Sequence, residues 1–135
     1  MPKKIFVNLP VKDLNKSMEF FKKLGFSFNE QFTDETAASM VITGDIYAML
    51  LTEQKFKQFT KKEIVDATKS TEVLVALSVD SKEEVNQMMQ KVFDAGGREA
   101  REAQDYGFMY GRAFEDLDGH IWEIFYMDPN YVKKV

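Results

Sequence analysis

Hydrophobic positions along the first part of the chain predict a strand, a helix and three more strands. Apolar residues alternate with other residues over 5–11, and from Asp13 to Gly25 they recur at helical spacing. Asp13 is a good N-cap, and Gly25 is a good helix terminator. Strand-like runs follow near 26–32, 37–43 and 46–52. The pattern therefore predicts a βαβββ module over about residues 1–52.

The same order of elements returns after a polar linker at about 53–71, in which we expect a short helix. A strand pattern over 73–79 precedes Ser81-Lys-Glu-Glu84, a capping box that begins a helix, and Gly96-Gly97 ends that helix. Further strands are expected near 98–102, 108–114 and 121–126, with Asp118-Gly119 as the turn before the last strand. A second βαβββ module is therefore expected over about 72–130.

Two pairs of segments support this repeat. Ile5–Val11 resembles Val73–Val79, and Gly44–Leu51 resembles Gly119–Tyr126. Neither module can bury a whole apolar face by itself, so we expect one α+β domain over 1–135, with a groove between the modules as the ligand site.

Strand alternation predicts which residues line the ligand side of the sheet. The aliphatic residues Ile5, Val7, Leu9 and Val11 should lie beneath a helix. The residues expected on the opposite, ligand side are Phe6, Asn8, Pro10, Ile46, Ala48, Leu50, Leu74, Ala76, Ser78, Ile121, Glu123 and Phe125. Glu123 is the only carboxylate in this set.

Composition excludes several classes of function. The chain has no cysteine and one histidine, which removes disulfides, thiolate catalysis and metal sites built from several Cys or His ligands. A formal charge of −4 at pH 7 argues against a nucleic-acid partner. No apolar run reaches the roughly 20 residues of a membrane span, so a cytoplasmic protein without a membrane partner is expected.

Glu123 has two interpretations. It can act as a general base or as the anchor for a cationic ligand. It can also be an internal ion pair or hydrogen-bond partner of Arg112, Tyr110 or another polar group, because an unpaired buried carboxylate is costly.

The segment 105–112 is the candidate for ligand contact beside Glu123. Tyr106 and Tyr110 can stack on a flat ligand, and Arg112 can pair with a ligand carboxylate. Alternatively, these aromatic residues only cap the sheet or form a dimer interface.

Two longer motifs carry a family resemblance. They are VNLPVKDLNKSMEFFKKLGF over 7–26 and FEDLDGHIWE over 114–123. With them the chain resembles the vicinal oxygen chelate superfamily, which holds glyoxalases, extradiol dioxygenases and bleomycin-resistance proteins. In detail it resembles the bacterial group labelled as predicted lactoylglutathione lyases or glyoxalase-like proteins. The resemblance implies paired βαβββ modules in a cup-shaped mixed sheet, a homodimer, and a divalent metal in the enzymatic members.

The resemblance also places four metal-ligand positions at Phe6, Ala48, Leu74 and Glu123. Three of these side chains are apolar and cannot bind a metal, so no metal cofactor is expected beyond an improvised site at Asn8 and Glu123. The first function hypothesis is therefore a metal-free protein that binds a small aromatic or cationic molecule, with Phe125 and the residues above as contacts. The alternative is a glyoxalase-like lyase or isomerase with Glu123 as its catalytic base and a non-standard metal site. Whether the protein is an enzyme stays open at this point.

Overall fold

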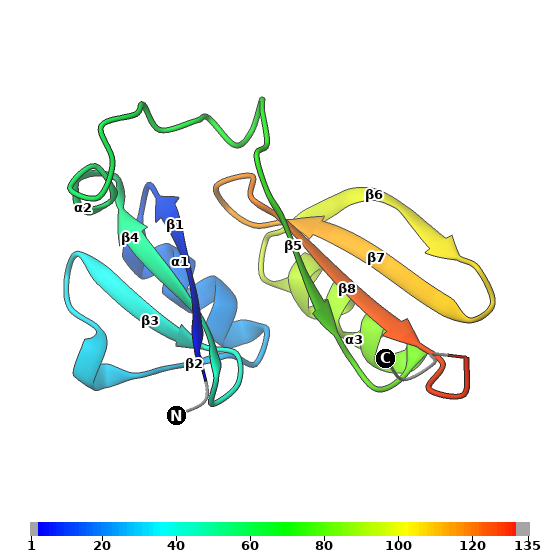
Figure 1. The fold of residues 1–135 in the computed structure, drawn as a ribbon. Coiled ribbons are helices and arrows are strands. Elements are labelled where there is room, and N and C mark those ends of the chain that lie inside the picture. The colour runs from blue at the N-terminus through cyan, green and yellow to red at the C-terminus, as the bar shows by residue number, and fades with distance from the viewer. Residues whose placement is uncertain (1–2, 132–135) are drawn as a thin grey trace. The chain divides into compact units, whose positions relative to one another are not determined.

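The computed structural model describes residues 3–131, which form two compact units divided between residues 65 and 66 (Figure 1). The first unit contains β1 (Ile5–Val11), α1 (Leu14–Lys23), β2 (Ser27–Phe28), a 3-10 turn at Glu30–Phe32, β3 (Ala37–Val41), β4 (Ile46–Thr52) and α2 (Glu53–Phe56). The second contains β5 (Leu74–Ser78), α3 (Lys82–Asp94), β6 (Arg98–Asp105), β7 (Met109–Glu115) and β8 (Ile121–Met127). Among residues 3–131, none of the helices has the length and apolar character needed to span a membrane.

Each unit contains one four-stranded mixed sheet of the same topology. The strand order is β1-β4-β3-β2 in the first sheet and β5-β8-β7-β6 in the second. In each, the first strand is parallel to the last, and the other neighbours are antiparallel. The predicted α+β fold of two βαβββ modules is confirmed.

Local capping signals place both long helices where the sequence predicts them. The Asp13 carboxylate accepts a hydrogen bond from the Lys16 amide at 3.1 Å, and Gly25 adopts φ = +105° after α1. The Ser81 hydroxyl accepts from the Glu84 amide at 3.1 Å, and the Glu84 carboxylate accepts from the Asp80 amide at 3.2 Å. A capping box predicts that Glu84 accepts from the amide of the cap residue Ser81, but here it accepts from the amide of Asp80, one residue earlier.

The predicted strand over 26–32 is mostly wrong, because only Ser27 and Phe28 pair with β3. The Asn29 side chain accepts a hydrogen bond from the Gln31 amide at 3.0 Å and so caps the 3-10 turn that follows. An Asx-type bond of this kind competes with strand pairing, which explains why the strand ends there.

One face of each sheet packs against its own helix. In the second unit α3 covers β7 and β8, and Trp122, Phe114 and Met89 are at most 1% exposed. In the first unit α1 lies against β3 and β4. The fully buried side chains on its side include Phe20, Phe21, Leu24, Met40, Ala48 and Leu50, each at most 2% exposed. We call the opposite face of each sheet its helix-free face.

The register of β4 corrects the predicted position of Ala48. Ala48 pairs with Val7 and Met40, which share the helix-covered face, and its side chain is 0% exposed. Tyr47 and Met49 lie on the helix-free face instead, so Ile46, Ala48 and Leu50 do not. Because side chains alternate along a strand, an error of one residue in register moves every side chain to the other face.

Candidate functional site

A cross-strand row of four residues forms the centre of the helix-free face of the second sheet. Arg101 on β6 pairs with Ala113 on β7, Ala113 pairs with Glu123 on β8, and Glu123 pairs with Ala76 on β5. Ala76 is exposed and leaves room on one side of Glu123, whereas Ala113 on the other side is buried. Register shifts between Glu99 and Arg101 and between Arg101 and Gln104 bring Arg101 onto this face.

Arg101 crosses the buried Ala113 and binds the Glu123 carboxylate. Its Nη2 lies 3.3 Å from Glu123 Oε2 and 3.3 Å from Gln104 Oε1. The side chains of Arg101 and Glu123 are 33% and 25% exposed, so both remain open to solvent. The pair is therefore a partly buried ion pair at the surface of the sheet. It confirms that Glu123 has an internal partner, but that partner is Arg101 and neither Arg112 nor Tyr110.

A second cross-strand row lies beside this one. Gln104 pairs with Gly111, and Gly111 pairs with Phe125, which pairs with Ser78. A Cβ at Gly111 would lie 3.5 Å from the Cβ of Phe125. Phe125, Leu74 and Glu123 thus lie on the helix-free face, as their alternation predicts, with Leu74 half exposed.

The helix-free face of the first sheet carries a pair of stacked rings. Phe6 on β1 and Tyr47 on β4 pair in register, and their ring centroids lie 4.8 Å apart with planes 9° apart. Lys4 Nζ lies 5.5 Å from the Tyr47 ring centroid and donates to the Gly44 carbonyl at 2.9 Å. Phe6 is 53% exposed, and the neighbouring Asn8 is exposed on the same face. We call Phe6 and Tyr47 the aromatic platform.

Tyr110 and Arg112 lie on the opposite face of the second sheet, against α3. The Tyr110 hydroxyl donates to Asn86 Oδ1 at 2.8 Å, and Arg112 Nη1 donates to the same atom at 3.1 Å. Arg112 also binds Glu99 through Nε and Nη2, at 3.3 and 2.9 Å. These contacts tie α3 to the sheet and do not bring either residue to Glu123.

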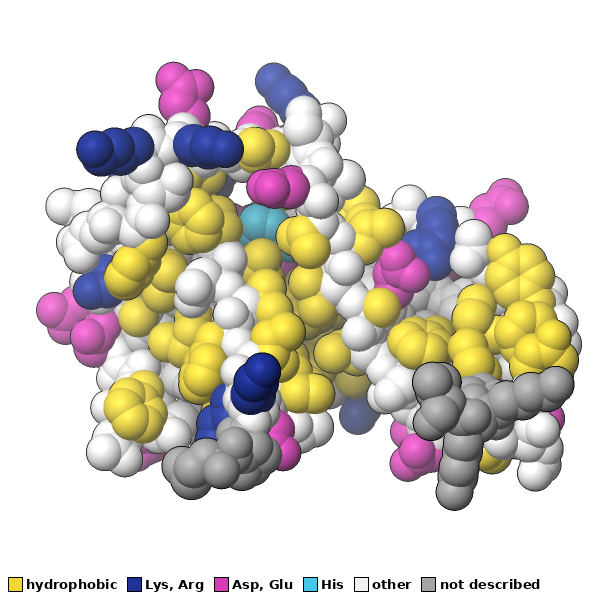
Figure 2. Space-filling model, in the orientation of Figure 1, with side chains coloured by type: hydrophobic (Ala, Val, Ile, Leu, Met, Phe, Trp, Pro, Cys, Tyr) yellow, Lys and Arg dark blue, Asp and Glu magenta, His cyan; other side chains and the backbone are white. Residues whose placement is uncertain are grey.

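Tyr106 belongs to a separate group of rings at the β6–β7 hairpin. It stacks on Phe108, with centroids 6.4 Å apart, and Phe108 stacks on Tyr131, with centroids 4.1 Å apart. Tyr106 and Tyr131 are 58% and 61% exposed. In Figure 2 hydrophobic side chains gather on this part of the second unit. Tyr106 thus stays a candidate contact residue, away from the Arg101–Glu123 pair.

The metal positions implied by the resemblance do not carry a suitable donor set. The residue of β4 that matches Glu123 is Met49, because Met49 pairs with Asn8 as Glu123 pairs with Ala76. Phe6 and Leu74 have no donor atom, and the thioether of Met49 is too soft for a hard divalent cation. Within residues 3–131, no three His, Asp or Glu side chains lie close enough to hold a metal ion. The residues present therefore do not fit the divalent metal of the family's enzymes.

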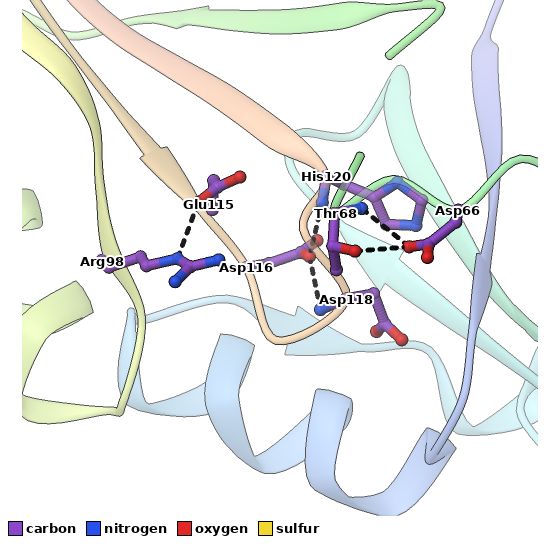
Figure 3. Close-up of polar contacts among 7 residues, drawn as sticks. All are labelled: Asp66, Thr68, Arg98, Glu115, Asp116, Asp118 and His120. Atoms are coloured by element: carbon purple, nitrogen blue, oxygen red, sulfur yellow. Dashed lines mark hydrogen bonds and ion pairs between the residues drawn. The ribbon is translucent and has the colours of Figure 1, made fainter. Parts of the chain in front are cut away.

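The turn between β7 and β8 is organised by a buried carboxylate (Figure 3). Asp116 Oδ1 accepts from the amides of Asp118 and His120, both at 3.0 Å, and Oδ2 accepts from Trp122 Nε1 at 3.1 Å. Burial raises the pKa of Asp116 above its usual value of 3.8, and the nearby His120 opposes that rise. Three hydrogen bonds to one carboxylate indicate a structural role for the FEDLDGHIWE motif.

The raised pKa of Asp116 predicts an unusual pH dependence of stability. The folded protein takes up this proton at a higher pH than the unfolded chain, so the contribution of Asp116 to stability falls as pH rises from about 3.8 through the raised pKa. In Asp116→Asn this contribution is absent, and the Trp122 indole N–H also faces an amide that cannot accept all three bonds, at a cost of about 1–3 kcal/mol. The check is the free energy of unfolding in urea from pH 4 to pH 8. We expect the wild type to lose stability relative to Asp116→Asn as pH rises.

Asp34→Asn serves as a control that should show no such trend between pH 4 and pH 8. Hydrogen bonds from the amide and hydroxyl of Thr36 lower the pKa of Asp34, so its contribution is present above pH 3.8 and is lost as pH falls through the lowered pKa. The same trend in both variants would contradict the assignment for Asp116.

Comparison with known proteins assigns the family. The model of the glyoxalase/bleomycin resistance protein/dioxygenase superfamily matches residues 5–124, and the chain belongs to this superfamily. A hypothetical protein from S. aureus has a similar structure, with 34% identity and a TM-score of 0.78, covering 93% of this chain and 95% of that one. No match was found among curated protein sequences.

Two more distant structures share the fold alone. A glyoxalase/bleomycin resistance protein/dioxygenase family enzyme from Burkholderia phytofirmans is 16% identical with a TM-score of 0.77, covering 93% of this chain and 99% of that one. The genomically encoded fosfomycin resistance protein from Listeria monocytogenes is 17% identical with a TM-score of 0.68, covering 96% and 97%.

Proposed function

We propose that this protein is a small-molecule-binding member of its superfamily that works without a bound divalent metal and holds a planar aromatic cation on the aromatic platform. The observation that carries the proposal is the exposed stack of Phe6 on Tyr47. Phe6 stands at a position for which the family resemblance implies a metal ligand. Lyase chemistry through a family metal is not proposed, because three of the four matching side chains cannot bind a hard cation.

The geometry of the platform supports a stacked ligand. β1 is the edge strand of its sheet, and Tyr47 covers the inner side of the Phe6 ring. The outer side of Phe6 can therefore take a third ring in the same stack. Stacked aromatic pairs contribute about 0.5–1.5 kcal/mol beyond the burial of their area.

The π system of the platform and the net charge of the chain support a cation among planar ligands. Lys4 Nζ lies 5.5 Å from the Tyr47 ring centroid, a cation–π contact of the kind that we propose for a cationic ligand. The chain carries a formal charge of −4, which attracts cationic ligands over a longer range.

Removing the Phe6 ring should weaken binding of a planar cation. We expect Phe6→Leu to reduce the affinity for N-methylquinolinium about 3- to 10-fold, because the side chain stays apolar but can no longer stack. The measurement is an NMR titration of protein that has been dialysed against EDTA. Tetraethylammonium, a cation without a ring, should bind the wild type and the variant equally weakly.

Phe59→Leu is the matched control. Phe59 is 68% exposed and is the same residue type outside the platform, so its replacement should leave the affinity unchanged. Equal affinity of the wild type and Phe6→Leu would contradict the proposal. A stoichiometric divalent ion in the purified protein that is lost in Glu123→Ala would contradict it as well.

A further inference from the structure

The Arg101–Glu123 pair uses less of its hydrogen-bonding capacity than the Arg112–Glu99 pair of the same unit. Arg101 donates only through Nη2, in two bonds that are both 3.3 Å long. Within residues 3–131, its Nε and Nη1 donate to no protein group, and Glu123 Oε1 accepts from none. Arg112 shows the contrasting case, since Nε, Nη1 and Nη2 all have partners. The Arg101 side chain is 33% exposed, so its open donors are accessible to a ligand.

The unused atoms lie together on the helix-free face. The Gln104 amide group accepts from Arg101 through Oε1, and its NH2 donates to no other residue that the structure describes. Ala113 and Gly111 are buried in the sheet beside these groups, whereas Ala76, next to Glu123, is exposed and too small to cover them. The face thus presents guanidinium and amide N–H donors next to a free carboxylate oxygen.

The charges of these groups define the ligand that fits. A guanidinium fork binds a carboxylate through two parallel hydrogen bonds, and the Gln104 NH2 can supply a third. Glu123 Oε1 can accept from an ammonium group beside that carboxylate. An anion without an ammonium would meet the Glu123 charge, and a cation without a carboxylate would meet the Arg101 charge. A ligand with both groups leaves every charge paired, which partly buried charges require.

We propose that Arg101, Gln104 and Glu123 form a receptor for a zwitterionic ammonium carboxylate, the head group of an amino acid. Ligand binding replaces the single long contact between Arg101 and Glu123 by shorter bonds to the ligand. The site uses only residues of the second unit, whereas the aromatic platform uses residues of the first.

Three probes with one carbon skeleton test the charge requirement. L-leucine carries both charges, 4-methylpentanoate lacks the ammonium, and 3-methylbutylamine lacks the carboxylate. We expect L-leucine to bind at least about tenfold more tightly than either analogue, in titrations followed by amide chemical shifts. None of the probes has a ring, so Phe6→Leu should bind L-leucine as the wild type does. A failure of this test is therefore distinguishable from a failure of the aromatic platform.

Matched variants test the residues. Arg101→Lys keeps the charge but loses the fork, and Glu123→Gln keeps the shape but loses the charge; each should weaken L-leucine binding about tenfold. Arg98→Lys is the control, because Arg98 lies on the same strand, pairs with Glu115 at 2.7 Å and lies outside the receptor. Equal binding of 4-methylpentanoate and L-leucine would overturn the proposal in favour of a simple anion site. So would the absence of L-leucine binding to folded wild-type protein at millimolar concentration, or an equal loss in Arg98→Lys.

Discussion

Gly119→Ala should destabilise the protein by about 2–5 kcal/mol, a large part of the total stability of a domain of this size. Gly119 has φ = +91°, a left-handed conformation that costs an alanine about 1–2 kcal/mol. A Cβ at this position would also lie 2.8 Å from the Thr68 amide nitrogen and 2.9 Å from the Ala67 carbonyl group. These are backbone atoms, so the segment that contains them must move as a whole. Urea unfolding followed by circular dichroism measures the effect.

The displaced segment is itself held in place by a small turn, which explains why it cannot yield cheaply. Asp66 Oδ1 accepts from the amide of Thr68 at 3.0 Å and from its hydroxyl at 2.6 Å. Figure 3 shows this turn beside Asp118 and His120. Gly119 is therefore the point at which the segment before β5 meets the turn before β8.

Gly107→Ala separates the two causes of this effect. Gly107 has φ = +82°, close to that of Gly119, but nothing lies within 4 Å of a Cβ built there. Its replacement should cost only the conformational part, about 1–2 kcal/mol. Equal losses in the two variants would mean that the close approach of Ala67 and Thr68 contributes nothing.

The elements predicted best from sequence are those with local causes. The caps at Asp13 and Ser81 act within one helical turn, and the structure has them as predicted. The alternation that places Leu74, Glu123 and Phe125 on one face is equally local, because it depends only on each strand's own pattern.

The position of Arg101 could not be predicted from alternation. Arg98, Arg101 and Gln104 share the helix-free face, at a spacing of three residues, because two register shifts interrupt β6. A regular strand over 98–102 would place Arg101 on the face opposite Arg98. The bulges depend on pairing with β7, which no local signal in the sequence specifies.

The error at Ala48 has a related cause. Aligning Gly44 with Gly119 gives an offset of 75 residues, whereas the pairing of Met49 with Asn8 and of Glu123 with Ala76 gives 123 − 49 = 74. The two glycines are not equivalent, because Gly119 has a positive φ and Gly44 does not. The similar sequences at these two turns therefore gave an alignment in which β4 is shifted by one residue.

Glutamate scanning across this one-residue difference should give opposite results at neighbouring positions. Ala48→Glu should destabilise the protein by more than about 3 kcal/mol, because it puts a charge at a site that is 0% exposed beneath α1. Met49→Glu should stay within about 1 kcal/mol of the wild type, because Met49 lies partly exposed on the helix-free face. The measurement is the free energy of unfolding in urea, with an amide NMR spectrum to show that each variant has the native fold.

Ala48→Met distinguishes the buried charge from simple crowding. Methionine is about as large as glutamate, and overpacking of this kind costs about 1–3 kcal/mol, so this variant should be more stable than Ala48→Glu. If Ala48→Glu folded normally and Met49→Glu did not, the offset of 75 would be correct and the register of β4 wrong. Ala48 would then face the ligand side. Tyr47 would lie on the other face of the sheet, and the aromatic platform would no longer contain it.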